Sequence, residues 1–169
     1  MSVSSTLSLA ASVVQSRALD MTTAEDPLVF RQAVQLSDGT AAGQADRVFH
    51  DRRTLAASAS EDLDLAGSLV DAFGQTVEFA RIKGLYVRAA SANVNNVVLG
   101  NAAATAWAAL LGATGTLTLR PGAGVGVVAG EADATAYAVG AGTADLLKVA
   151  NSGAGTSVTY DVVIVGASA

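Results

Sequence analysis

The chain contains no cysteine, and this absence removes three kinds of site at once. Disulfide frameworks, thiolate nucleophiles and the commonest structural zinc sites all need cysteine side chains. His50 is the single histidine, so it is the one imidazole that could act as a general base or bind a metal. We therefore expect no enzyme: no catalytic residue, no cofactor and no bound metal.

Charge is also scarce. Charged residues make up 15% of the 169 residues, against about 25% in typical soluble domains. The net charge is −5, and the ten Lys and Arg residues are scattered without a basic run. The electrostatic footprint of nucleic-acid binding is therefore missing. The composition is 51% hydrophobic and only 5% aromatic, which indicates a surface that is covered in large part by partner proteins.

Long apolar runs are absent as well. No segment reaches the roughly 18 uninterrupted apolar residues of a membrane span, and residues 1–21 lack the basic region and apolar centre of a secretory signal. We therefore expect a protein made in the cytoplasm, with no membrane partner. The length suits one ordinary domain and a terminal arm.

What the sequence does contain is a series of short β patterns. Residues 1–26 are rich in Ser, Thr and Ala and are expected to form an extended N-terminal arm, with a short helix at 10–19 as an alternative. From Pro27 a two-residue alternation begins, which predicts a half-buried strand ending at Leu36. The predicted β-domain therefore spans residues 27–169.

Further strands are expected wherever alternating segments are bounded by Gly, Asn, Ser or Pro. They are predicted at 47–55, 61–65, 76–88, 95–99, 116–120, 125–129, 135–139, 146–150 and 157–165. A phase slip in 76–88 places a bulge at Lys83-Gly84. Short strands at this spacing favour an all-β fold, either a β-sandwich or a barrel. The alanine-rich run 102–111 is interpreted as a loop or a helical turn.

The stretch VFHDRRTLAASASEDLDL, residues 48–65, has the composition of an active site, but its pattern favours a simpler interpretation. By strand alternation, His50 shares a face with Arg52 and not with Asp51. No G-x-S-x-G motif singles out a partner serine. We therefore interpret His50 as a surface or interface residue.

The carboxylates Glu61, Asp62 and Asp64 lack the glycine that a calcium loop needs between its ligands. A glycosidase pair drawn from distant positions stays open but has no support in the sequence. We favour a solvated strand face whose acids pair with Arg52 and Arg53 across a hairpin.

Two further features resemble functional motifs. The glycine run 121–126 lacks both the dinucleotide spacing and the Gly-Lys-Ser/Thr ending of a phosphate loop, and its Pro-Gly start favours a hairpin turn. Trp107 stands alone among alanines and is interpreted as a packing anchor, either in the core or at a subunit contact.

Two segments together suggest a family. DRVFHDRRTLAASASEDLDLAGSLVDAFGQTVEFARIKGL and the closing DLLKVANSGAGTSVTYDVVIVGAS resemble small virion structural proteins of tailed bacteriophages. The similarity covers residues 46–169, and the N-terminal arm matches less closely. The resemblance implies a decoration or cement protein on the capsid surface of the virion, with a jelly-roll type of β-sandwich, assembly as trimers and the major capsid protein as partner.

The leading hypothesis is therefore a capsid-stabilising protein whose residues 1–26 lie across neighbouring shell subunits, held by many modest contacts. The alternatives are a tail tube, terminator or connector protein, a particle-displayed receptor- or glycan-binding module and, last, an enzyme such as a depolymerase. The candidate interface residues are Leu7, Leu9, Val13, Val14, Arg52, Arg53, Glu61, Asp62, Asp64 and Trp107.

Overall fold

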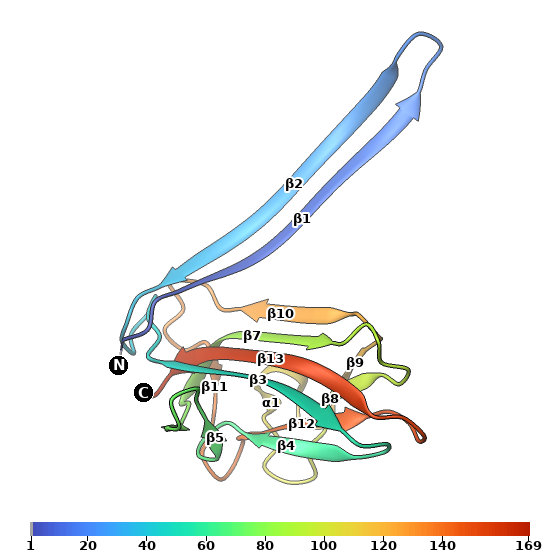
Figure 1. Ribbon diagram of the computed structural model, residues 1–169. Helices are drawn as coiled ribbons and strands as arrows, with labels where there is room; N and C mark the ends of the chain where they lie inside the picture. Colours follow the sequence, from blue (N-terminus) through green and yellow to red (C-terminus); the bar gives the residue numbers. More distant parts are fainter. Residues whose placement is uncertain (1) are drawn as a thin grey trace.

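The computed structural model describes residues 2–169 and consists almost entirely of antiparallel β-strands (Figure 1). The strands are Ser5–Ala18 (β1), Thr23–Leu36 (β2), Arg47–Leu55 (β3), Ser60–Asp64 (β4), Leu69–Val70 (β5), Thr76–Val77 (β6), Arg81–Ala89 (β7), Val97–Gly100 (β8), Thr116–Leu119 (β9), Gly124–Val128 (β10), Tyr137–Ala138 (β11), Leu146–Asn151 (β12) and Val158–Ala167 (β13). A single turn of helix, Ala108–Leu111 (α1), precedes β9.

Two sheets form the body of the molecule. Sheet I has the order β10-β7-β13-β3, with β11 beside β7, and sheet II has the order β4-β12-β8-β9. The all-β, antiparallel sandwich expected from the sequence is thereby confirmed. The pairing is nested along the chain, because β3 pairs with β13, β4 with β12, β7 with β10 and β8 with β9.

The core lies between the inner faces of the two sheets, and strand alternation decides which side chains enter it. In β13, Val158, Tyr160, Val162 and Ile164 are buried, whereas Val163 points outward and is exposed. Burying a side chain of this size contributes about 1.5–3 kcal/mol relative to leaving it in water. The predicted bulge is confirmed, since the register of β7 against β13 skips Lys83.

The N-terminal part of the chain forms a two-stranded ribbon that projects away from the sandwich (Figure 1). Strands β1 and β2 have 14 residues each, which at about 3.4 Å per residue makes the ribbon roughly 45 Å long. We call residues 5–36 the arm. The helix considered for 10–19 is wrong, because residues 10–18 pair with β2 as a strand and Leu19 lies in the turn.

Two sequence-based assignments of connectivity differ from the structure. The strand that begins near Pro27 belongs to the arm and not to the sandwich, so the arm continues to Leu36 instead of ending at residue 26. The glycine run 121–126 is not a hairpin turn, because it links β9 in sheet II to β10 in sheet I. Local alternation identified the first as a strand and the Pro-Gly start identified the second as a turn, but neither signal carries information about which strands pair.

The helical content of residues 2–169 includes no segment long and apolar enough to cross a lipid bilayer.

Candidate functional site

The arm is anchored at its base by apolar packing on the outer face of sheet I. Leu7, Val34 and Leu36 are buried there against Ala45 and Val165. Of the candidate interface residues, Leu7 therefore makes an intramolecular contact. This packing fixes the direction in which the arm leaves the sandwich.

Two glycines of sheet I allow the arm to lie this close. A Cβ atom built on Gly84 would lie 2.6 Å from Cδ1 of Leu7, and one built on Gly126 would lie 2.8 Å from Cδ2 of Leu9. Both distances are far below an ordinary van der Waals contact of about 3.5–4.0 Å. The two leucines therefore occupy space that any other residue at these positions would fill.

Hydrogen bonds hold the chain where the arm meets the sandwich. The backbone N–H of Val3 donates to Asp38 over 2.9 Å, and the N–H of Ala45 donates to the carbonyl of Ser37 over 2.8 Å. Asp46 accepts two bonds from Ser168, one from its N–H and one from its hydroxyl. The arm therefore starts from a fixed base.

Beyond its base the arm is apolar on both faces. The register pairs Val13 with Leu28 on the face that continues from Leu7, which we call the underside; Phe30 lies on the same face. The opposite face carries Val14 and Val29. These five side chains are 55–75% exposed. A ribbon of two strands is at best marginally stable in water unless another element packs on one of its faces. The middle of the arm is therefore an apolar surface on which a partner is expected to pack.

The far end of the arm is acidic and ends in two apolar side chains. The turn between β1 and β2 presents Leu19 and Met21, and Met21 is 98% exposed. The adjoining residues include Asp20, Glu25 and Asp26 against one Arg17. The tip and the middle therefore differ in chemistry and can serve different contacts.

A cleft opens where the arm separates from sheet I. It has a volume of about 610 Å³ and is lined by Leu9 of the arm and by Tyr86, Val163 and Gly126 of the sheet, among other residues. Because the cleft is bounded by the arm on one side and the sheet on the other, we call it the wedge. Both of its walls are mainly apolar.

The outer face of sheet I carries a row of charges beside the wedge. Asp161 of β13 accepts hydrogen bonds from Arg52 of β3 and from Arg88 of β7, each with one contact of 2.6 Å. The hydrogen bonds from Arg52 and then Arg88 lower the pKa of Asp161 to about 2. The row has two cations and one anion, so it carries one net positive charge.

The other charged candidates lie at the seam between the sheets. Glu61 of β4 pairs with Arg53 of β3 and accepts a hydrogen bond of 2.8 Å from the hydroxyl of the buried Tyr160. Asp62 is exposed, and Asp64 accepts a turn bond from the N–H of Ala66. The hairpin expected for these charges is wrong, since β3 and β4 belong to different sheets. The Arg53–Glu61 pair is part of the structure of the sandwich itself.

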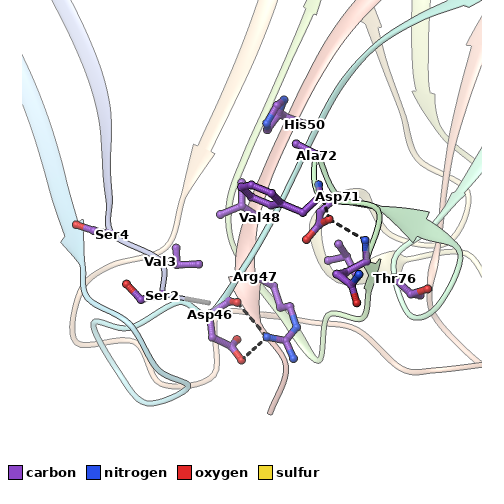
Figure 2. Close-up of a pocket in the computed structure, with 13 residues that line it drawn as sticks. Ser2, Val3, Ser4, Asp46, Arg47, Val48, His50, Asp71, Ala72 and Thr76 are labelled. Atoms are coloured by element: carbon purple, nitrogen blue, oxygen red, sulfur yellow. Dashed lines mark hydrogen bonds and ion pairs between the residues drawn. The ribbon is translucent and has the colours of Figure 1, made fainter.

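His50 lies in a groove of about 530 Å³ between residues 2–4, the start of β3 and the β5–β6 turn. Figure 2 shows the imidazole at one end of this groove and the Asp46–Arg47 pair at the other. The carboxylate of Asp71 accepts turn bonds from backbone N–H groups. Within residues 2–169, no hydrogen bond joins His50 to a carboxylate.

Trp107 is a core residue. Its indole is 5% exposed, packs edge-on against Tyr137 and donates a 2.8 Å hydrogen bond to the carbonyl of Ala138. Of the two interpretations made from the sequence, packing in the core is the correct one. Its place among the candidate interface residues is therefore corrected.

The described part of the chain contains no group of three or more His, Cys, Asp or Glu residues placed to hold a metal ion. Comparisons with protein-family models, with curated proteins and with solved structures found no match.

The structure adds residues to the candidate surface that sequence reasoning missed. Val13 and Val14 were expected at an interface and are exposed, but their partners across the register, Leu28 and Pro27, were assigned to the sandwich. A signal was present in the sequence: Leu28, Val29 and Phe30 are consecutive apolar residues, so both faces of that strand are apolar.

Proposed function

We propose that the chain is a virion structural protein of the capsid-decoration type, which stabilises a phage head by binding the major capsid protein. The observation that carries the proposal is the arm, whose apolar middle and tip have no cover in a single chain. Exposed apolar patches of this kind mark contacts with other proteins. The resemblance of residues 46–169 to small phage virion proteins supports the choice of partner.

The strand order supports the jelly-roll interpretation. In nested pairing the first strand of the sandwich lies beside the last, the second beside the second-last, and so inward along the chain. Jelly rolls are eight-stranded double sheets of antiparallel strands and occur in viral capsid proteins and lectins. A fold of this kind is compatible with a structural role at the surface of the virion.

The proposal assigns no catalytic residue and no cofactor. The function of the protein is contact, and its affinity comes from adding many modest apolar interactions across several subunits. In this arrangement the sandwich fixes the direction of the arm, and the tip with Leu19 and Met21 contacts the capsid shell.

The test is a variant in which the arm is shortened and its base is retained. Because Ala10 lies opposite Arg31 in the register, residues 11–30 can be replaced by Asn-Gly, which closes a two-residue hairpin turn. The packing of Leu7, Val34 and Leu36 is then kept. Heads assembled without the protein are mixed with the intact or shortened chain, and co-sedimentation is measured.

The intact chain should co-sediment at a copy number close to that of the shell protein, and the shortened chain should not bind. Unchanged binding of the shortened chain would contradict the role of the arm. Circular dichroism and thermal unfolding of the shortened chain serve as the control that the sandwich is folded.

A second candidate is a tail tube or connector subunit. The arm favours it because both outer edges of the ribbon are unpaired: β1 and β2 form a separate two-stranded sheet. Unpaired edges can add strands from neighbouring subunits to form a continuous sheet. Imaging of negatively stained particles distinguishes the two, since a tail protein is found in rings or tubes and in few copies per particle.

A further inference from the structure

Both faces of the arm carry exposed apolar side chains, so each face needs a surface that packs against it. Of the eleven large hydrophobic side chains that are exposed in the described residues, seven lie on the arm. Val13, Leu28 and Phe30 are on the underside, and Val14 and Val29 are on the opposite face. A partner that packed on one face alone would leave the other in water.

Both walls of the wedge are mainly apolar, so an element that fills it must present an apolar face to each wall. Its lower wall is the outer face of sheet I, at Tyr86 and Val163, and its upper wall is the underside of the arm, beginning at Leu9. The upper wall continues the packing of Leu7 and Val34 on the sheet. An element inserted there extends an apolar interface that already exists within the chain.

We propose that the occupant of the wedge is the middle of the arm of a second copy of this chain. The arm is the element of the described chain that presents apolar side chains on both faces, and the wedge is the site that requires them. Two sheets packed face to face lie about 10 Å apart, so the inserted ribbon forms one layer between the sheet and the arm of its host.

Charged residues of opposite sign lie at the same distance from the apolar residues on sheet I and on the arm. On sheet I, Arg88 follows Tyr86 by two residues, and Asp161 lies two residues from Val163. On the arm, Asp26 lies two residues beyond Leu28, and Glu25 two residues beyond Pro27. Two residues span about 7 Å in both strands.

An arm inserted with β2 antiparallel to β7, and with its apolar pair over Tyr86 and Val163, therefore places a carboxylate over the positively charged row of Arg52, Asp161 and Arg88. This holds for either face of the inserted arm, because Asp26 continues the underside and Glu25 the opposite face. Charge complementarity of this kind fixes the register of an interface more than it adds affinity.

The inference rests on the proposed function and deepens it, because it divides the arm between two partners. The middle of the arm binds a second copy, and the tip is left for the shell. A reciprocal exchange between two copies is a closed assembly, in which each arm has one face against the sheet of its partner and the other against the arm of its partner.

The first experiment measures self-association of the purified full chain by sedimentation velocity, with no shell protein present. The intact chain should form a closed oligomer. The double variant Val13→Ser, Leu28→Ser should associate about 100-fold more weakly, because it removes the apolar contacts of the underside. The matched control is Val94→Ser, which changes a side chain that is also exposed but lies outside the arm and the wedge.

The second experiment locates the contact and uses the absence of cysteine from the chain. Two single variants of different mass, Leu28→Cys and Val163→Cys, are mixed and oxidised, so a disulfide between them joins two copies. The expected product is the mixed dimer. A pair of Leu28→Cys with Val94→Cys should give none.

The third experiment tests the register. Arg88→Glu should weaken association, and combining it with Glu25→Arg and Asp26→Arg should restore it. A chain that is monomeric at all concentrations, or an oligomer unchanged by the Val13/Leu28 variant, would overturn the inference.

These outcomes are distinguishable from failure of the proposed function. A monomer that still binds heads through its arm rejects the arm exchange alone. An arm-exchanged oligomer that binds no head rejects the capsid partner alone.

Discussion

Arg53 on β3 and Glu61 on β4 form an ion pair that joins the two sheets of the sandwich at their seam. Glu61 also accepts the hydroxyl hydrogen bond of Tyr160, a buried residue of the central strand β13. One carboxylate thus binds a cation and a phenol from sheet I; removing it leaves the Tyr160 hydroxyl without its acceptor and Arg53 with Asp51 alone.

We therefore predict that Glu61→Gln lowers the free energy of unfolding by about 1–3 kcal/mol, because a part-buried donor loses a charged acceptor. Tyr160→Phe should cost about 1 kcal/mol, since it removes one hydrogen bond and keeps the ring. Urea unfolding measures both. Asp62→Asn, an exposed change on the same strand, is the control and should shift stability by less than about 0.5 kcal/mol.

The fall in the free energy of unfolding at acidic pH should depend on Asp161. Its pKa is lowered to about 2 by the hydrogen bonds from Arg52 and Arg88, from a reference value of 3.8. The folded state therefore binds this proton less tightly than the unfolded state does. The stabilisation is complete above pH 3.8 and is lost as the pH falls toward about 2.

The measurement is the urea midpoint of the intact chain and of Asp161→Asn between about pH 5 and pH 2. The variant should be less stable at pH 5, and its disadvantage should shrink as the pH falls. Parallel curves for the two proteins would contradict the assignment.

Gly84→Val should loosen the base of the arm. A Cβ at this position would lie 2.6 Å from Leu7, so the larger side chain must displace Leu7 or the strand, at a cost of about 1–3 kcal/mol. We expect faster hydrogen exchange in β1 and faster proteolysis of the arm, with the sandwich intact. Gly130→Val, where nothing lies within 4 Å of the added atom, is the control.

Trp107→Phe should lower stability without changing assembly. The variant loses the part-buried hydrogen bond to the carbonyl of Ala138, and this loss together with the lost side-chain volume in the core should cost about 2 kcal/mol. Thermal unfolding and sedimentation velocity measure the two effects. A change in oligomeric state at unchanged stability would return Trp107 to the interface.

Strand positions in the sandwich were predictable because alternation is a local property. Residues 47–55 and 146–150, for example, correspond closely to β3 and β12, and the phase slip at Lys83 located the bulge. Which strand pairs with which was not predictable from alternation. Pro27 begins an alternating segment whether its partner is the sandwich or β1, and the arm was therefore divided at the wrong residue.

The exposed surface of the arm could be predicted only in part, because sequence alternation does not show which strands pair. Val13 and Val14 were identified from the sequence as candidate interface residues, but the exposure of Leu28 and Phe30 follows from their pairing with β1, which places them outside the core. Glu61 had the opposite outcome: it was expected on a solvated face and lies at the seam, because the turn after β3 carries the chain from one sheet to the other.

The nested pairing has a consequence for the order in which the molecule folds. Strand β13 lies between β7 and β3, and contacts such as Arg52 with Asp161 join residues 109 positions apart. Sheet I therefore lacks its middle until the last strand has been synthesised, and closing such distant contacts is slow. The base of the arm packs on Val165 of that last strand, and a two-stranded ribbon alone is at best marginally stable. The apolar side chains of residues 5–36 are therefore exposed to neighbouring proteins during synthesis, before the sandwich that anchors them has formed.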